Sequence, residues 1–569
     1  MMRANRALIA LQQLNAGKLD DRLLDPLTEH WESFVITKAN ELSVQERVLD
    51  CCTSRSPPPD ALHVDAALRR LRGAASGSGA VLNSSAHDFG KVMKHLRKLG
   101  PEKPENLPRR GDTFPSHWSV IDLPEEGTHP VMITRVSPKA AAYLKDWKQK
   151  MLKEDFKQER EKSGVEAHVD KHFRGDNILE LAVRMAKANM LRAVEDNVDT
   201  VGLFTVVKKC EWQKVGDQYE LVVALRLVFD QRRSNCGWKD PPWCGLASVA
   251  SMTYLDASVE LAAPGTTLEY AKGDIPSYFY VLELPTDLSE HFCLPGLTAD
   301  RLRTELAKRS LAMLPGHGQH VALAVTPMGW NWAVFLAQST IEDVFDQGGA
   351  RPGSFIQPEQ RVTDGAAIPG LLSPAHIEYV DDFGFIGVVD NEGIDESAVT
   401  LAAREAKTLL KAAGFGVHKE SQSSHEEIIG GEFVNSWLLP HQKKLWSAVA
   451  MVEAFLLVGA GPPAMVETIL GTLSWYFLIE RGALSIFNSV YHFCRTHRHK
   501  PRMDIPKEVL RELAAAAAVA PLLGVNLGAQ WVEKVYLFDA STIGGAVGCA
   551  DASTEELRNE ARWASRGGW

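Results

Sequence analysis

The chain has 569 residues, of which 45% are hydrophobic and 24% are charged; this composition is typical of soluble globular proteins, and the length predicts about three or four domains. The formal net charge of −10 argues against a protein that coats nucleic acids through general positive charge, although a local basic cleft is compatible with it. No apolar run is long enough to span a membrane, and the eight cysteines show neither paired spacing nor a secretory context, so we expect an intracellular protein, cytoplasmic or nuclear, that does not associate with membranes.

The first part of the chain, residues 1–200, shows helical periodicity in several places. One example is 138–162, where Lys and Glu recur at three- and four-residue spacings. Segments rich in Pro, Gly, Ser or charge interrupt these stretches. We expect a mostly helical N-terminal extension with loops. It contains no motif that carries chemistry, so it is an extension specific to the element, a partner-binding region or a scaffold for the rest of the chain.

Two segments with alternating apolar and polar residues follow, at 203–209 and 219–229, and they predict an antiparallel β-ribbon. The second segment leads through Arg226 to Asp230 and Asn235. Arg226 carries a guanidinium, a group that can bind two phosphate oxygens while neutralising them. A surface strand with ordinary ion pairs explains the same residues equally well.

Residues 272–285 predict a further strand, which starts near Asp274 and has Phe279 five residues after that aspartate. Core packing of the aromatic ring explains this spacing by itself. Downstream, Pro327 and Gly329 indicate a turn before a helical segment that reaches Gln338. Glycine at such a turn permits close approach of the backbone to another group.

The most informative stretch is 376–389, in which two apolar, β-branched runs are joined by Asp381 and Asp382. This pattern predicts a β-hairpin with both acids at its turn. Adjacent carboxylates repel each other, so the turn is either well solvated or binds a multivalent cation.

An amphipathic helix is predicted over 396–413, and Gly414 is placed to end it. Its expected buried side carries Leu401, Ala402, Leu409 and Leu410. Lys419 follows in a short polar segment. A solvated side chain is the ordinary explanation for a lysine at this place.

The rest of the chain is predicted to be helical between 440 and 495, with a break at 459–463, and an Ala-rich helix follows within 501–527. After these helices, 535–549 has the pattern of a strand, a glycine turn and a second strand.

Tyr379, Val380, Asp381 and Asp382 between apolar strands resemble the catalytic hairpin of reverse transcriptases. Other segments are similar to further motifs of that family and occur in the family's order: Arg226-Asp230-Asn235, Asp274-Phe279, Pro327-Gly329-Gln338 and Lys419. The ordered series is more specific than any single segment and covers about residues 203–500. The chain departs from the family at Ala333 and Val334, where a small residue followed by Pro is usual in the helix that ends in Gln.

The resemblance implies an α+β fold of the right-hand polymerase type. Fingers and palm, with an antiparallel sheet, would occupy 201–435, and a helical thumb or connection would occupy 436–530. The segment 531–569 contains Asp539-Ala-Ser, which resembles the opening hairpin of ribonuclease H domains. Because most of that fold and its other acids are absent, we expect a truncated remnant without ribonuclease activity.

The resemblance also implies roles for individual residues. Asp274, Asp381 and Asp382 would be catalytic and would bind two Mg²⁺ ions, with Mn²⁺ as a possible substitute, while Lys419 would protonate the leaving pyrophosphate. Phe279 would exclude a ribose 2′-hydroxyl by its bulk. The nucleotide and template-primer contacts would come from Arg226, Asp230, Asn235, Phe279, Gly329, Gln338 and Tyr379.

We therefore expect an RNA-directed DNA polymerase of a retroelement, which adds deoxynucleoside triphosphates to a primer on an RNA or DNA template. One alternative is a catalytically inactive, domesticated scaffold that binds nucleic acid or protein. The intact carboxylates argue against it, because a scaffold has no need to hold them together. A second alternative is an RNA-dependent RNA polymerase, which Phe279, the Tyr-Val sequence before the acids and the Asp539 hairpin disfavour.

Overall fold

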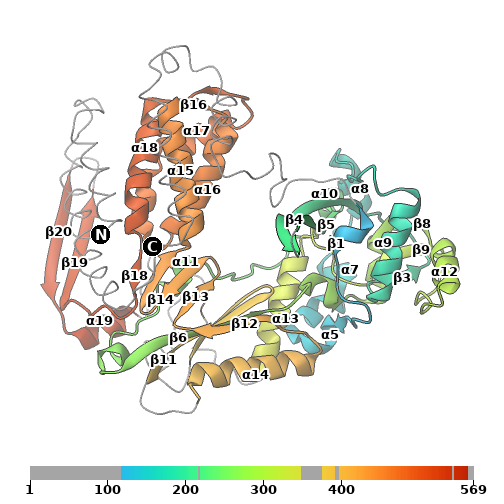
Figure 1. Cartoon of the computed structure of the whole chain (residues 1–569), viewed down its shortest axis with the longest axis horizontal. Helices are drawn as coiled ribbons and strands as arrows, with labels where there is room; N and C mark the ends of the chain where they lie inside the picture. The colour runs from blue at the N-terminus through green and yellow to red at the C-terminus, as the bar shows by residue number, and fades with distance from the viewer. Residues whose placement is uncertain are drawn as a thin grey trace. The chain divides into compact units, whose positions relative to one another are not determined.

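The computed structural model describes residues 117–215, 218–347, 356, 374–390, 396–540 and 544–561 (Figure 1). Expectations for residues 1–116 therefore lie outside the described residues. The described elements include both α-helices and mainly antiparallel sheets, which confirms the α+β class. The described residues divide into two compact units, one formed by those within 117–247, 254–428 and 528–561, and the other by those within 248–253 and 429–527.

The larger unit contains a four-stranded sheet in the order β10-β11-β6-β12. Its strands are β10 (Ala375–Tyr379), β11 (Asp382–Asp390), β6 (Thr266–Asp274) and β12 (His418–Ser423). All neighbouring strands are antiparallel. The predicted hairpin is confirmed by the pairing of β10 with β11, which puts Tyr379 opposite Asp382.

The strand at Asp274 differs from the expected one. β6 ends at Asp274, whereas the sequence pattern predicted a strand that starts there, so that prediction is wrong. Pro276 has no N–H for strand pairing, and Ser277 has a φ of +53°, so the chain leaves the sheet. A 3-10 helix, η4 (Tyr278–Val281), follows, before the short strand β7 (Leu282–Glu283).

Two long helices cover the sheet face that carries Phe383 and Phe385. From α13 (Ala333–Gln347), Phe345 contacts both rings. α13 begins at Ala333 but continues beyond Gln338, so Gln338 lies inside the helix and does not end it. The sequence pattern had placed it at the end of the helix.

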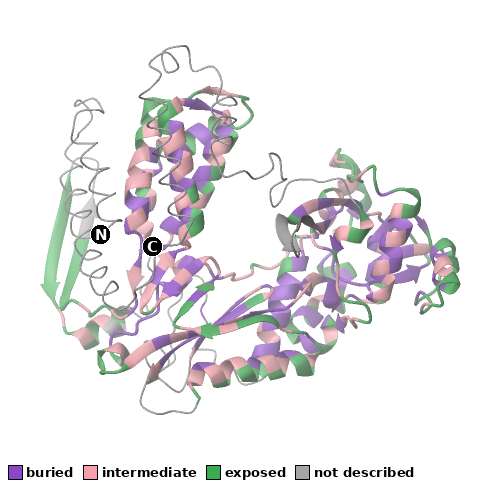
Figure 2. Ribbon diagram, in the orientation of Figure 1, coloured by how far each residue is buried: buried purple, intermediate pink, exposed green. Residues whose placement is uncertain are grey.

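The second helix on this face is α14 (Ala398–Ala413), which matches the predicted helix. Ser397 caps its start, and Gly414, with a φ of +100°, ends it as expected. The buried stripe consists of Val399, Ala406 and Leu410, while Leu401 is 50% exposed. The predicted buried side was therefore wrong for Leu401, and Figure 2 shows exposed and half-buried residues along much of the helix.

The predicted β-ribbon is confirmed by the antiparallel pair β4 (Gly202–Val215) and β5 (Gln218–Asp230). A short strand, β1 (Ile121–Asp122), extends it by parallel pairing with β5, so that Asp122 is opposite Arg226. β2 (Val131–Met132) pairs with β7, and β3 (Leu191–Val194), β9 (His320–Leu323) and β8 (Cys293–Thr298) form another sheet. Residues 117–200 thus contribute strands to the same sheets as later residues.

Residues 117–200 also share a hydrophobic core with the rest of the larger unit. The helical periodicity predicted over 138–162 is confirmed by α6 (Pro138–Leu144), α7 (Trp147–Lys150) and α8 (Phe156–Lys162). The Trp147 and Phe156 rings both contact Trp238, which in turn contacts Trp330. The remaining described helices of this unit are α5 (Ile133–Val136), α9 (Gly175–Lys187), α10 (Arg232–Asn235), α12 (Ala299–Lys308) and α19 (Thr554–Ala561).

The smaller unit is a helical bundle with its own core. Its helices are α11 (Val249–Met252), α15 (Gln442–Val458), α16 (Pro463–Phe477), α17 (Ser489–His497) and α18 (Lys507–Val519). The predicted break is confirmed, because Gly459 ends α15 in a left-handed conformation and Pro463 begins α16. The strands are β14 (Gly431–Val434), β15 (Trp437–Pro440), β16 (Ala460–Gly461), β17 (Met503–Asp504) and β18 (Val525–Asn526).

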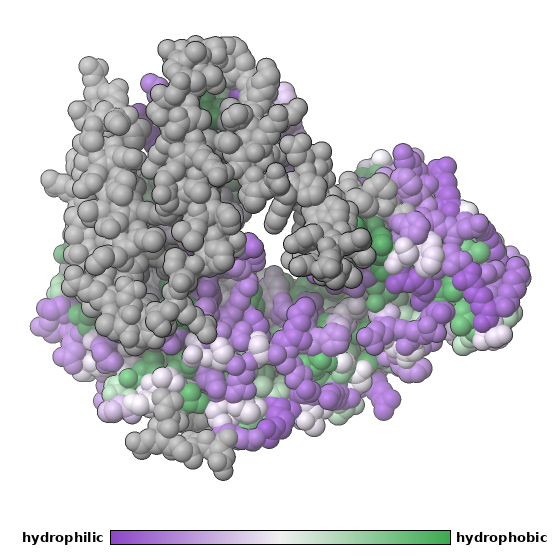
Figure 3. Space-filling view, in the orientation of Figure 1, coloured by the Kyte–Doolittle hydropathy of each residue, from purple (hydrophilic) through white to green (hydrophobic). Residues whose placement is uncertain are grey.

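The hairpin predicted near the end of the chain is also present. β19 (Lys534–Ala540) pairs antiparallel with β20 (Gly545–Asp551), and every residue of β20 is exposed. Across the described ranges, the helices are all too short or too polar to cross a membrane. Figure 3 shows hydrophilic residues over much of the visible described surface.

Candidate active site

Three aspartates meet at one end of the four-stranded sheet. Asp382, the first residue of β11, is paired directly with Asp274, the last residue of β6. Directly opposed residues of antiparallel strands have Cβ atoms about 4.5–5.5 Å apart. Asp381 lies in the adjoining turn, where its carbonyl accepts a hydrogen bond from the Ile275 N–H at 2.8 Å. The structure therefore places Asp274 beside Asp381 and Asp382.

These carboxylates disfavour one another's charge. Burial raises the pKa of Asp381, and the negative charge of Asp274 adds to the rise. For Asp382, burial and the charges of Asp381 and Asp274 raise the pKa to about 6. A positive ion at this point would relieve both the repulsion and the loss of hydration.

Lys419 supplies one such charge. Its ammonium forms an ion pair with Asp274 Oδ2, while the Lys419 side chain remains 80% exposed. The register of β12 against β6 shifts between His418 and Ser421, and Lys419 lies in that irregularity with a φ of +48°. Its hydrogen bond to Asp274 raises the pKa of the Lys419 ammonium.

Asp274 also has an oxygen that suits a cation. Its Oδ1 atom is buried and has no hydrogen-bond partner, which is costly for a carboxylate oxygen. Carboxylate oxygens are the ligand type that Mg²⁺ and Mn²⁺ prefer. Within the described ranges, however, no three His, Cys, Asp or Glu side chains are close enough to hold a metal ion as they stand. The donor chemistry fits, and binding would require the carboxylates to come closer together and Lys419 to release Asp274.

The charge of Arg226 acts on this acidic site, and Phe279 follows Asp274 along the chain. The Arg226 charge acts on Asp381 and opposes the rise in the pKa of that carboxyl. Phe279 follows Asp274 in η4, between Tyr278 and Tyr280, which are only 2% and 4% exposed. Phe279 itself is half-buried, so it is the ring of this group of three that retains an accessible surface.

Asp230 has its partners inside the protein. Its carboxylate accepts hydrogen bonds from the Arg232 guanidinium at 2.7 Å and from the His168 N–H at 2.9 Å. The Arg232 hydrogen bond is the main reason that the pKa of Asp230 is lowered to about 2. These contacts fix the end of β5, and the predicted nucleotide contact of Asp230 stays a prediction.

The structure brings Asn235 and Gly329 together. The Asn235 amide donates to the Gly329 carbonyl at 2.9 Å and accepts from the Asn331 N–H at 3.0 Å. Gly329 has a φ of +117°, and a Cβ atom at this position would lie 2.3 Å from the Phe229 carbonyl oxygen. Glycine is required here by the protein's own backbone, and its predicted approach to template-primer stays a prediction.

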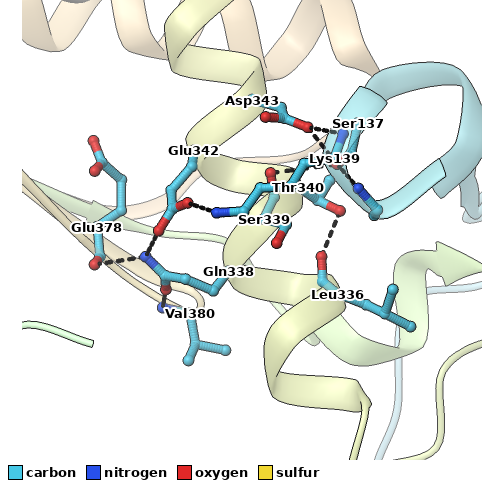
Figure 4. Close-up of polar contacts among 11 residues, drawn as sticks. Ser137, Lys139, Leu336, Gln338, Ser339, Thr340, Glu342, Asp343, Glu378 and Val380 are labelled. Carbon is cyan, nitrogen blue, oxygen red and sulfur yellow. Dashed lines mark hydrogen bonds and ion pairs between the residues drawn. The ribbon is translucent and has the colours of Figure 1, made fainter. Parts of the chain in front are cut away.

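Gln338 has no exposed surface. From α13 it reaches Glu378 and Val380, which lie just before the acids of the turn (Figure 4). Its Oε1 accepts the Val380 N–H at 2.8 Å, and its Nε2 donates to the Glu378 carbonyl at 3.1 Å and to Glu342 at 2.9 Å. The resemblance implied a substrate contact for Gln338. The structure gives all its polar atoms partners within the chain, and the predicted substrate contact stays a prediction. Tyr379, half-buried at the end of β10, completes the predicted set.

Two features of the site were not predicted. Val380 has a φ of +58°, and β-branched residues rarely adopt such a conformation, so no sequence signal pointed to it. Tyr278 is fully buried and donates its hydroxyl to the Ala337 carbonyl at 3.0 Å. Burial, together with the charge of Asp381, raises the pKa of Tyr278 well above its usual range, so its phenol stays neutral beside the acids.

Comparisons with known proteins give low similarity. No protein-family model matches the chain, and no curated protein matches it. One similar solved structure is a foamy viral protease-reverse transcriptase dRH in complex with double-stranded DNA, at 12% identity and a TM-score of 0.41, covering 76% of this chain and 68% of that one. Another is a foamy viral protease-reverse transcriptase in complex with an RNA/DNA hybrid, at 12% identity and a TM-score of 0.37, covering 82% and 46%. At these values the functional conclusion depends on the acidic site itself.

Proposed function

We propose that this protein is an RNA-directed DNA polymerase that extends a primer 3′-hydroxyl with deoxynucleotides. The observation that carries the proposal is the pairing of Asp274 with Asp382, with Asp381 in the adjoining turn. Residues more than a hundred positions apart thereby place three acids at the same end of one sheet. Two-metal phosphoryl transfer requires such a group of carboxylates.

Asp274, Asp381 and Asp382 would hold two Mg²⁺ ions, or Mn²⁺, which when bound would activate the primer hydroxyl and offset the charge of the leaving pyrophosphate. Arg226 would bind triphosphate oxygens, since its guanidinium lies near Asp381 and can contact two oxygens at once. Lys419 would donate a proton to the pyrophosphate. Once Asp274 no longer holds its ammonium, the pKa of Lys419 returns towards its usual value and the proton is easier to release.

Phe279 would select the sugar. It is the accessible ring of the three consecutive aromatic residues after Asp274. A phenyl ring under the nucleotide sugar leaves no room for a 2′-hydroxyl, which favours deoxynucleotides over ribonucleotides. This residue is the main argument for a DNA polymerase over an RNA polymerase.

The inactive scaffold is the second candidate. It is disfavoured by the free-energy cost of keeping the acids charged and close together. Burial and mutual repulsion raise the pKa of both Asp381 and Asp382. A protein that used the fold only for binding would gain stability by losing one of these charges.

Under the polymerase proposal, the sheet with the acids is the palm, the β4–β5 ribbon belongs to the fingers, and the helical bundle of the smaller unit is the thumb.

Primer extension tests the proposal. We expect the wild-type chain with Mg²⁺ or Mn²⁺ to add deoxynucleotides to a DNA primer on an RNA template, and Asp381→Asn or Asp382→Asn to abolish this addition while circular dichroism stays unchanged. Asp300→Asn is a suitable control, because Asp300 is 82% exposed on α12. Extension by either active-site variant at the wild-type rate would refute the site, and its absence from the wild type would favour the scaffold.

A further inference from the structure

The turn that carries the catalytic acids is held in an unusual conformation. Val380 is left-handed, with a φ of +58°, and a β-branched residue adopts this conformation only where its surroundings hold it. Two hydrogen bonds do so: the Val380 N–H donates to Gln338 Oε1, and the Asp381 carbonyl accepts from the Ile275 N–H, both at 2.8 Å. The position of Asp381 and Asp382 therefore depends partly on Gln338.

The Gln338 carboxamide satisfies its partners in only one orientation. Its nitrogen faces a carboxylate oxygen of Glu342 and the carbonyl of Glu378, which can only accept, and its oxygen faces the Val380 N–H, which can only donate. Exchanging the two ends of the amide would break all three hydrogen bonds. Because Gln338 is fully buried, water cannot replace the lost partners.

Glu342 is itself held in place from α6, as Figure 4 shows. Its Oε2 forms an ion pair with Lys139 at 2.9 Å, which leaves Oε1 to accept from Gln338. The neighbouring Asp343 anchors the start of α6 to α13, accepting the Lys139 N–H at 2.9 Å and the Ser137 hydroxyl at 2.6 Å. The Glu342 side chain is 16% exposed, so this contact is largely shielded from water.

We propose that Glu342, held by Lys139, is a positioning residue for the catalytic hairpin. It fixes the Gln338 carboxamide so that the amide oxygen holds the Val380 N–H, and the acids of the turn with it. The inference rests on the proposed function for the reaction that the hairpin serves, whereas the chain of hydrogen bonds is a property of the fold. Neither Lys139 nor Glu342 belongs to a motif found in the sequence.

Hydrogen–deuterium exchange tests the chain of contacts without any catalytic assay. Peptides that cover 376–384 are followed in the wild type, in Glu342→Ala and in a control, Glu180→Ala. Glu180 forms an ion pair with Arg309 between other elements of the same unit, and its side chain is 24% exposed, close to the value for Glu342. We expect exchange of the Val380 amide to be about tenfold faster in Glu342→Ala and unchanged in the control. Equal rates in the two variants would overturn the inference.

A double-mutant cycle in primer extension tests whether Glu342 acts through Gln338. We expect Glu342→Ala and Gln338→Met each to lower kcat about tenfold, with little change in KM for the nucleotide, and the double variant to be no slower than Gln338→Met alone. Lys139→Arg should keep the ion pair and the rate, and Lys139→Met should lose the ion pair and part of the rate. Additive losses would overturn the inference.

The two tests separate the possible failures. A wild-type protein that does not extend primers refutes the proposed function, while the exchange rates still decide whether Glu342 orders the turn. A wild-type protein that extends primers, with unchanged exchange in Glu342→Ala, refutes the inference alone.

Discussion

Replacing Asp382 by asparagine is expected to stabilise the protein at neutral pH when no divalent ion is present. Burial and the charges of Asp381 and Asp274 raise the pKa of Asp382 from 3.8 to about 6. If this rise in the pKa of Asp382 acted fully on the free energy of unfolding, it would lower that free energy by about 3 kcal/mol at neutral pH. The Asp382 residue still has a substantial exposed surface, so solvent screening reduces the expected contribution to about 1 kcal/mol.

The direction of the pH dependence follows from proton binding. Because the folded-state pKa of Asp382 is above the unfolded value, the folded protein binds more protons between pH 3.8 and about 6. The wild type should therefore lose this stability as the pH rises through that window. The Asp382→Asn variant carries no charge at this position and should not show the loss. The two proteins should be similar near pH 4 and should differ by about 1 kcal/mol at about pH 7.5.

Urea unfolding at about pH 4 and about pH 7.5, in EDTA, measures this difference. Added Mg²⁺ should then stabilise the wild type and not Asp382→Asn, because the variant lacks one ligand. Asp300→Asn serves as the control, since removing that exposed acid leaves the acidic site unchanged. If Asp382→Asn were less stable than the wild type at the higher pH in EDTA, the reasoning about repulsion among the three carboxylates would be refuted.

Three further predictions concern neighbouring residues. Phe279→Val should raise the use of ribonucleotides relative to deoxynucleotides at least about tenfold in kcat/KM, and an unchanged ratio would contradict steric selection. Lys419→Met should lower single-turnover incorporation about 100-fold by removing the proton donor, and should leave the protein folded, since the Lys419 side chain is 80% exposed. Gly273→Ala should lower the free energy of unfolding by about 1–3 kcal/mol, because a Cβ atom there would lie 2.5 Å from Phe383, whereas Gly471→Ala, with no atom within 4 Å, should not; equal urea midpoints for these two variants would contradict the packing argument.

The hairpin with Asp381 and Asp382 could be predicted from the sequence because its signal is local. Two apolar, β-branched runs around a short polar turn specify a hairpin without reference to the rest of the chain. The end of β6 at Asp274 could not be predicted in the same way. It depends on Pro276 and on the left-handed Ser277, and these residues interrupt an apolar pattern that otherwise continues.

The role of Gln338 could not be predicted from a sequence pattern either, but for a different reason. Its partners are backbone groups of the hairpin and a carboxylate one helical turn later, and their convergence is a property of the folded chain. The buried side of α14 was misassigned at Leu401 because each residue turns a helix by about 100°, so a small error in the orientation of the buried stripe exposes a leucine. Apolar residues on both sides of the stripe made the sequence ambiguous.

The aromatic cluster around Trp238 sets a lower limit on the polypeptide that can fold. Trp147 and Phe156 cover this indole from residues that precede the β4–β5 ribbon, and Trp330 continues the cluster to the turn at Gly329. A shortened polypeptide starting at residue 201 would lack Trp147 and Phe156, would expose Trp238 to water, and would lose the strand that pairs with β5 beside Arg226. A shortened polypeptide should therefore begin no later than Ile121, the first residue of β1.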